Sequence, residues 1–135
     1  MRIALDSSVL IAANISRAGT CAELLEDLLL HHELVISKFI LEELNRKLIE
    51  KFHFPRREAD QVVSFLRRVG TVVVPADLPA DLCRDPEDIP ILGTAVAGEC
   101  ALLLSVDRDR PDMHTIQDIP IVRPGEFWRR TSEEM

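Results

Sequence analysis

Aromatic residues are scarce in this chain, with five Phe, one Trp and no Tyr among 135 residues. Modules that read single-stranded nucleic acid stack bases on several aromatic side chains, so the composition disfavours an RRM-like or OB-like module. Positive charge is also in deficit, because 16 Lys and Arg stand against 23 Asp and Glu and leave a net charge of −7. This balance disfavours sequence-independent binding of nucleic acid by the whole surface, although it is compatible with a concentrated acidic site.

The chain also has few cysteines and no long apolar run. Cys21, Cys83 and Cys100 are an odd number, lie far apart and form no CxxC pair, which predicts neither a disulfide framework nor a zinc knuckle. No uncharged apolar run reaches the roughly 18 residues of a membrane span, and Asp6 interrupts the stretch where a signal peptide needs its apolar segment. We therefore expect a cytoplasmic protein with reduced thiols, folded as one domain over residues 1–135.

Short apolar runs alternate with helical patterns along the chain. The runs predict strands at Ile3–Leu5, Leu34–Ile36, Thr71–Val74, Leu102–Ser105 and Ile121–Val122. The helical patterns predict helices from Thr20 to His31, from Ser37 to about Lys51, from Pro55 to Gly70, from Pro90 to Glu99 and from Pro124 onward. Apolar strands that alternate with helices indicate an α/β fold, a three-layer α/β/α sandwich with a central parallel sheet.

Three segments carry more specific predictions. The polar triplet Asp6-Ser7-Ser8 predicts a turn after the first strand. The acidic, proline-rich stretch 75–88 predicts a functional loop without regular structure. On the helix after Pro55, the spacing predicts an inner face made of Val62, Val63, Phe65, Leu66 and Val69.

Acidic side chains follow the predicted strands, where parallel sheets bind their ligands. Asp6 ends the first strand, Asp107 follows the fourth, and Asp88 precedes the helix after the acidic loop. Glu42 and Glu43 lie one turn into the helix after the second strand. Clustered carboxylates persist only with raised pKa values or a bound cation. An oxygen-only ligand set selects Mg²⁺ or Mn²⁺, so the pattern predicts a metal site for phosphoryl chemistry.

Each acidic position also has a structural interpretation. Asp6 can form an Asx-turn, Asp88 can cap a helix, and Asp107-Arg108-Asp109 can be an ordinary polar turn. These alternatives account for single residues, whereas acidic residues at four places along one sheet edge favour a shared site.

The two adjacent glutamates are not separated by pattern alone. Glu42 and Glu43 can form surface ion pairs with Arg46 and Lys47, four residues further along the helix. Both glutamates lie about 130° from the centre of the apolar stripe, so the helical wheel does not choose between them.

Four acidic blocks stand in a characteristic order: Leu5-Asp6-Ser7-Ser8-Val9-Leu10, Ser37-Lys38-Phe39-Ile40-Leu41-Glu42-Glu43-Leu44, Asp85-Pro86-Glu87-Asp88-Ile89-Pro90-Ile91 and Ser105-Val106-Asp107-Arg108-Asp109. This order, together with the closing Pro124-Gly125-Glu126-Phe127, resembles the PIN domain over nearly the whole chain. It is most similar to the bacterial and archaeal PIN toxins related to VapC.

The resemblance implies roles for particular residues. It implies that Asp6, Glu43, Asp88 and Asp107 hold the metal and carry catalysis. It places Asp85 and Asp109 beside them as accessory metal ligands. Ser105 matches the Ser or Thr two residues before the fourth acid, and Ser8 stands where the family usually has Asn. A Ser8 hydroxyl can still hydrogen-bond a carboxylate or a water molecule.

The resemblance also implies an activity and its partners. The activity is metal-dependent endoribonuclease hydrolysis of RNA phosphodiester bonds with Mg²⁺ or Mn²⁺, as the toxin of a type II toxin–antitoxin system. The implied partners are a small antitoxin protein and a second copy of the chain in a homodimer. An alternative is a non-catalytic PIN-like module that binds RNA or protein. A receiver-like phosphoacceptor domain would need paired acids after the first strand and a late Lys, which this sequence lacks.

Basic side chains on two predicted helices are the candidate surface for an RNA backbone. Their structural interpretation is that they are solvated helix faces. These residues are Arg46, Lys47, Lys51, Arg56, Arg57, Arg67 and Arg68.

Overall fold

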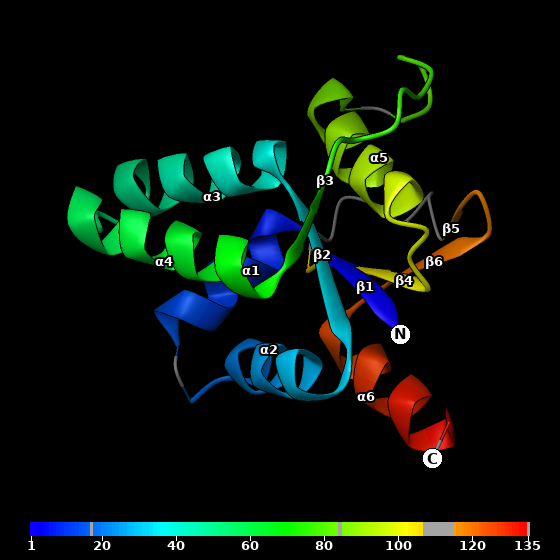
Figure 1. Cartoon of the computed structure of the whole chain (residues 1–135), viewed down its shortest axis with the longest axis horizontal. Coiled ribbons are helices and arrows are strands. Elements are labelled where there is room, and N and C mark those ends of the chain that lie inside the picture. The colour runs from blue at the N-terminus through cyan, green and yellow to red at the C-terminus, as the bar shows by residue number, and fades with distance from the viewer. Residues whose placement is uncertain (17, 84, 107–114, 135) are drawn as a thin grey trace.

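The computed structural model of the protein describes residues 1–16, 18–83, 85–106 and 115–134, and side chains up to residue 130 (Figure 1). The strands are β1 (Arg2–Leu5), β2 (Glu33–Ser37), β3 (Thr71–Val73), β4 (Leu102–Leu104), β5 (Thr115–Ile116) and β6 (Ile119–Val122). The helices are α1 (Ser7–Ile15), α2 (Thr20–His31), α3 (Lys38–Glu50), α4 (Arg56–Val69), the short 3₁₀ turn η1 (Pro86–Asp88), α5 (Ile89–Ala97) and α6 (Pro124–Glu134). Among these described helices, none combines the length and apolar character needed to cross a membrane.

The strands form one sheet in the order β3-β2-β1-β4-β6-β5. All neighbouring strands are parallel except β5 and β6, which pair antiparallel. The predicted α/β fold with a central, mostly parallel sheet is thus confirmed, and the β5–β6 hairpin is an addition to it. Gln117 and Asp118 form the hairpin turn at positive φ, which two-residue hairpin turns require.

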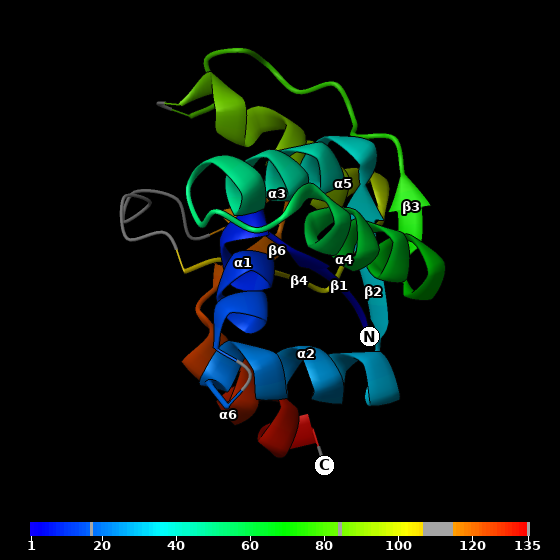
Figure 2. The same cartoon turned by 90° about the vertical axis from the view of Figure 1, so that its left-hand side faces the viewer.

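Helices cover both faces of the sheet, as the sandwich predicted. Figure 1 shows α5 on the opposite side of the strands from α1 and α4, and Figure 2 looks onto the side that carries α1 to α4. The apolar side chains of β1, β2 and β4 are buried between these layers because the central strands are covered on both sides. The carboxyl ends of β1 and β2 lead directly into α1 and α3, which places the starts of these helices along one edge of the sheet.

The predicted turn after β1 is wrong, because a helix begins there. Helix α1 starts at Ser7, and Asp6 caps it by accepting a hydrogen bond from the Ser8 amide at 3.3 Å. An acidic residue before two serines is typical of helix N-caps as well as turns. The residues that follow are mostly buried and apolar, so they lack the polar face that marks an amphipathic helix.

The buried residues of helix α4 also differ from those of its predicted inner face. Only Ala59 and Leu66 are fully buried on it, whereas Phe65 is 42% exposed and Val69 is 43% exposed. The helix lies over α3 and the edge strand β3 at the periphery of the layer, so Val62 and Val63 are half-buried against the core whereas Phe65 and Val69 remain more exposed.

Candidate active site

Asp6 lies at the point where β1 passes into α1, and the local structure fixes both its backbone and its carboxylate. Its backbone amide donates to the Leu104 carbonyl of β4 at 2.9 Å. Its Oδ1 accepts from the Ser8 amide, and its Oδ2 accepts from the Ser105 hydroxyl at 2.9 Å. The side chain is 4% exposed. Asp6 is therefore a buried carboxylate held by donors from α1 and from the end of β4.

Glu43 reaches the same region from α3. This helix begins after Ser37, whose hydroxyl accepts from the Ile40 amide at 3.3 Å and caps it. Glu43 is 8% exposed, and its Oε1 accepts from the Ser7 hydroxyl at 2.5 Å and from Lys47 Nζ at 3.1 Å. The neighbouring Glu42 is 66% exposed in its side chain and faces Lys38 at 3.8 Å. The packing of α1 on α3 therefore separates two glutamates that the helical wheel left equivalent.

Ser7 connects the two carboxylates. It is fully buried, and its hydroxyl oxygen lies 3.3 Å from Asp6 Oδ1 and 2.5 Å from Glu43 Oε1. These distances place the two acidic oxygens within roughly 6 Å of each other, a range over which like charges repel. A hydroxyl has one proton to donate, and the shorter contact directs it to Glu43. The structure thus holds two acidic groups together although their charges repel each other.

The acidic loop places its residues differently. Asp85 is exposed and caps η1, because its Oδ1 accepts from the Glu87 amide at 3.0 Å. Asp88 is half-buried at the start of α5. Apart from the single turn of η1, residues 75–88 are irregular where they are described, as predicted.

Two contacts fix the position of α5 relative to the rest of the site. Thr94 of α5 donates through its hydroxyl to the Pro90 carbonyl at 2.7 Å, and its oxygen lies 2.8 Å from the Ser37 hydroxyl that caps α3. At Gly93 the incoming loop passes so close that an added Cβ would lie 2.5 Å from the Ala76 carbonyl oxygen, and Ala76 N donates to the Gly93 carbonyl. The loop is therefore anchored on the helix that Asp88 begins.

Two predicted site residues, Asp107 and Asp109, lie outside the described residues. The chain is described up to Val106, whose amide donates to the Ser8 hydroxyl at 3.3 Å. Ser8 thus bonds the Asp6 carboxylate with its amide, while its hydroxyl accepts from the backbone that leads toward Asp107. Ser105 bonds Asp6 directly.

Sequence reasoning missed Ser7 and assigned Lys47 to a surface ion pair. The Lys47 pair forms, but it joins a buried carboxylate, whereas Arg46 pairs with Glu50 instead of Glu42. The sequence does hold a signal for the role of Ser7, because this residue directly follows an acidic residue that ends a buried strand. Recognising it requires the knowledge that a helix, and not a turn, begins there.

The donor set can be tested against the chemistry of a metal ion. Among the described residues, which exclude Asp107 and Asp109, no three His, Cys, Asp or Glu side chains lie close enough together to hold a metal. Asp6 and Glu43 are nevertheless brought together as a buried pair of carboxylates. Proteins often hold Mg²⁺ with one or two carboxylates, water and substrate phosphate, so this pair fits such an ion.

Comparisons with known proteins agree with this architecture. The chain is similar to VapBC2 of Rickettsia felis bound to a DNA fragment from its promoter, with a TM-score of 0.66, 14% identity and coverage of 91% of this chain and 98% of the other. It is also similar to VapBC-1 of nontypeable Haemophilus influenzae, with a TM-score of 0.64, 18% identity and coverage of 93% and 99%. No curated protein matches the chain. The sequence model of the PIN domain family matches residues 2–109, and the chain belongs to that family.

Proposed function

We propose that this chain is a VapC-like toxin and a divalent-metal-dependent endoribonuclease. In this proposal Asp6, Glu43, Asp88 and Asp107 are the catalytic metal ligands for Mg²⁺ or Mn²⁺. Asp85 and Asp109 are accessory ligands, and Ser8 and Ser105 support the first acid. The observation that carries the proposal is the burial of Asp6 and Glu43 on either side of one Ser7 hydroxyl. Two like charges held so close in the interior are a costly arrangement for stability alone.

The family supports the class of reaction, because PIN domains are generally nucleases. When bound, a divalent ion would activate water at neutral pH and neutralise charge on the phosphate. The chain's own residues orient the ligands. The Ser105 hydroxyl and the Ser8 amide fix the two oxygens of Asp6, and Ser7 fixes Oε1 of Glu43. This leaves Oε2 of Glu43 as the oxygen to which the described residues donate no hydrogen bond.

The adjacent glutamates provide a matched test. Glu43→Gln should lower RNA cleavage in the presence of Mn²⁺ by at least about 100-fold, whereas Glu42→Gln should leave it within about twofold. Both variants remove one charge from the same helix, so a difference between them reports position and not net charge. Asp6→Asn should behave like Glu43→Gln. Circular dichroism and the thermal midpoint in EDTA check that each variant is folded.

A second readout is independent of cleavage. Binding of Mn²⁺ can be measured by calorimetry on the same proteins, and the Glu43→Gln protein should bind the ion much more weakly than the Glu42→Gln protein. Cleavage that survives both Asp6→Asn and Glu43→Gln would contradict the catalytic proposal. RNA binding without cleavage by the unsubstituted chain would favour the non-catalytic alternative.

We also propose that residues 1–135 act as one cytoplasmic domain with two partners, a second copy of the chain and a small antitoxin. Apolar side chains that the described chain covers only in part support a protein partner. A hollow of about 430 Å³ lies among α1, α2 and α4, and Leu25, Phe54, Val62 and Phe65 line it. This groove suits an apolar helix of the antitoxin. Two solved structures similar to this chain are VapBC proteins, which supports this partner class.

Co-expression tests the antitoxin, and light scattering tests the homodimer. The protein encoded beside this chain in its operon should co-purify with the unsubstituted chain and be lost with Phe65→Asp. Light scattering of the purified chain should give twice the mass of 15.2 kDa. A monomer at micromolar concentration would contradict the homodimer, and co-purification unaffected by Phe65→Asp would contradict this groove.

A further inference from the structure

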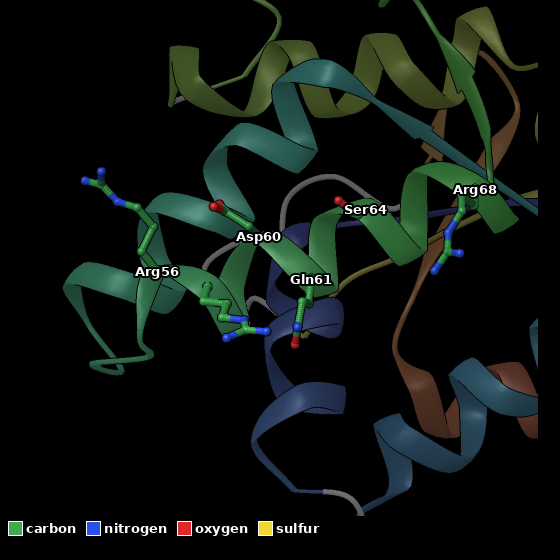
Figure 3. Close-up of a pocket in the computed structure, with 6 residues that line it drawn as sticks. Arg56, Asp60, Gln61, Ser64 and Arg68 are labelled. Carbon is green, nitrogen blue, oxygen red and sulfur yellow. The ribbon is translucent and has the colours of Figure 1, made fainter.

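The outer side of α4 carries a regular stripe of polar donors. Arg57, Gln61, Ser64 and Arg68 recur at intervals of four, three and four residues, which places them on one side of the helix. All four line an open hollow of about 810 Å³ together with Arg56 and Asp60. Figure 3 shows Gln61 and Ser64 along the helix between Arg56 near its start and Arg68 near its end. We call Arg57, Gln61, Ser64 and Arg68 the α4 stripe.

The basic side chains of α4 are concentrated, because four arginines lie on this one helix. Elsewhere, five basic side chains lie in ion pairs: Arg2 with Glu33, Lys38 with Glu42, Arg46 with Glu50, Lys47 with Glu43 and Arg130 with Glu126. Within the described residues, none of the four arginines of α4 makes an ion pair, and outside this helix the same holds for Lys51, Arg123 and Arg129. The one carboxylate of the hollow, Asp60, accepts from Asn45 Nδ2 of α3 at 3.0 Å. The helix therefore presents exposed guanidinium groups on a chain with a net charge of −7.

The helix dipole explains the positions of only two of these four arginines. Arg67 and Arg68 lie in the last turn, where the helix dipole favours positive charge. Arg56 and Arg57 lie in the first turn, where the same dipole disfavours it by about 0.3–1 kcal/mol each. A solvated helix face without a partner would gain nothing from this placement. The helix dipole therefore does not account for the first pair, although Glu58 is an acidic residue of the same turn.

A phosphodiester backbone fits these features. Guanidinium groups bind phosphate through two parallel hydrogen bonds, and amide and hydroxyl side chains such as Gln61 and Ser64 commonly contact phosphate and sugar. Arg57 and Arg68 are separated by 11 residues, or roughly 16 Å along the helix, which is long enough to face several consecutive phosphates. No aromatic side chain lines the hollow, so base stacking has no platform there. These features together favour contact with the backbone and not with the bases.

We propose that the α4 stripe binds the sugar-phosphate backbone of the RNA substrate at a distance from the bond that is cut. This inference rests on the proposed ribonuclease function and adds a substrate-binding surface to it. The stripe holds a flanking segment of RNA without reading its sequence. It also supplies positive charge locally to a chain whose total charge repels RNA.

The test compares two double substitutions that remove the same charge. Arg57→Gln with Arg68→Gln removes both ends of the stripe, and Arg123→Gln with Arg129→Gln removes two exposed arginines elsewhere. Glutamine keeps a good helix former at each helical position. Each pair is placed in the Asp6→Asn protein, and its binding to a fluorescent 20-nucleotide RNA is followed by anisotropy over a range of KCl concentrations. The same titration is repeated in EDTA with chains that retain Asp6, to check that the Asp6→Asn substitution does not itself change RNA binding.

The stripe variant should bind RNA about 10-fold more weakly at 100 mM KCl. Its slope of log affinity against log salt should fall by about 1.4, since each phosphate contact on a single strand contributes about 0.7. The control pair should change affinity less than about twofold. Equal losses in the two variants would show a general charge effect and overturn the proposal. An unchanged RNA affinity with lost binding to a poly-glutamate peptide would assign the stripe to an acidic protein partner instead.

Cleavage of two substrates separates this inference from the proposed function. With Asp6 intact and Mn²⁺ present, the stripe variant should cut the 20-nucleotide RNA several-fold more slowly, through a raised KM, while a tetranucleotide should be cut at the unsubstituted rate. Failure of the unsubstituted chain to cut either RNA would contradict the ribonuclease function itself. Normal cleavage of both substrates by the stripe variant would contradict only the stripe.

Discussion

The candidate site has two halves that the fold treats differently. Asp6 and Glu43 are buried, come from two elements at the sheet edge, and receive hydrogen bonds from α1, α3 and the end of β4. Asp85 caps a single 3₁₀ turn and Asp88 ends it, and Asp85 is exposed whereas Asp88 is half-buried. The first half is therefore part of the packed interior, and the second is carried by a loop on its surface. Substitutions in the first half should change stability and activity together, whereas those in the second should change activity with a smaller effect on stability.

The largest expected difference is between Glu43→Ala and Asp88→Ala. Removing Glu43 leaves Lys47 without its acceptor, leaves the Ser7 hydroxyl only its longer contact with Asp6, and opens a small cavity, at a cost of about 2–4 kcal/mol. Relief of repulsion with Asp6 offsets part of this cost. Asp88→Ala should cost less than about 1 kcal/mol. Urea unfolding in EDTA measures both, and equal destabilisation would show that the two halves are not distinct in this way.

Two adjacent serines sharpen the comparison within α1. Ser7→Ala removes the donor that joins both buried carboxylates and should cost about 1–2 kcal/mol. Ser8→Ala removes an oxygen that accepts one amide hydrogen at 3.3 Å, and it leaves the Ser8 amide bond to Asp6 intact. We expect it to cost about 0.5 kcal/mol or less. Thermal unfolding of the two variants without metal tests the order, and a larger effect for Ser8→Ala would contradict the bridging role of Ser7.

Two lysines of α3 repeat the contrast between buried and exposed acids. Lys47 Nζ lies 3.1 Å from the buried Glu43, in the favourable order with Glu first, and Lys47→Met should cost about 1 kcal/mol. Lys38 lies 3.8 Å from the exposed Glu42, with both side chains more than half exposed, and Lys38→Met should change stability by no more than about 0.3 kcal/mol. High salt should leave the difference largely intact because burial limits screening. If the two substitutions had equal effects on stability in 1 M KCl, the pair of Lys47 with Glu43 would behave as an exposed ion pair.

Much of the fold could be predicted from sequence because its central strands are buried on both faces. Such strands read as continuous apolar runs, as at Leu34–Ile36 and Leu102–Leu104. Helix α1 could not be predicted, because buried apolar residues on several sides remove the 3.6-residue period. On α4 the period was present, but it could not show that Phe65 and Val69 would stay uncovered. Periodicity marks an apolar face and does not identify what covers it.

The residues of the candidate site could be predicted from the sequence only in part, for a related reason. The end of a strand is visible in sequence, so Asp6 could be placed at the edge of the sheet. The choice between Glu42 and Glu43 depends on which side of α3 meets Ser7, and that is a property of tertiary packing. The same limit applies to Ser7, whose neighbour in space is 36 residues away in sequence.

The smallest expected effect concerns two cysteines, one in the interior and one in the acidic loop, whose thiol reactivity can be compared. Cys100 is 5% exposed, and burial raises the pKa of its thiol from 9.0 to about 11, with Arg2 opposing the shift. Cys83 lies in the acidic loop, is half-buried, and donates to the Asp85 carbonyl at 3.2 Å. At pH 8, a thiol reagent should therefore modify Cys83 well before Cys100, whose labelling requires unfolding of the interior.

Titration of Cys100 adds a pH dependence with a definite sign. Between pH 9 and about pH 11 the unfolded chain releases the Cys100 proton while the folded chain keeps it, so the free energy of unfolding falls as the pH rises through this window. The loss should be no more than about 1.4 kcal/mol at pH 10. In Cys100→Ala this part of the decline should disappear, while Cys83→Ala should retain it. If Cys83→Ala flattened the decline instead, the loop and not the interior would hold the protonated thiol, and the contrast between the two halves would be reversed.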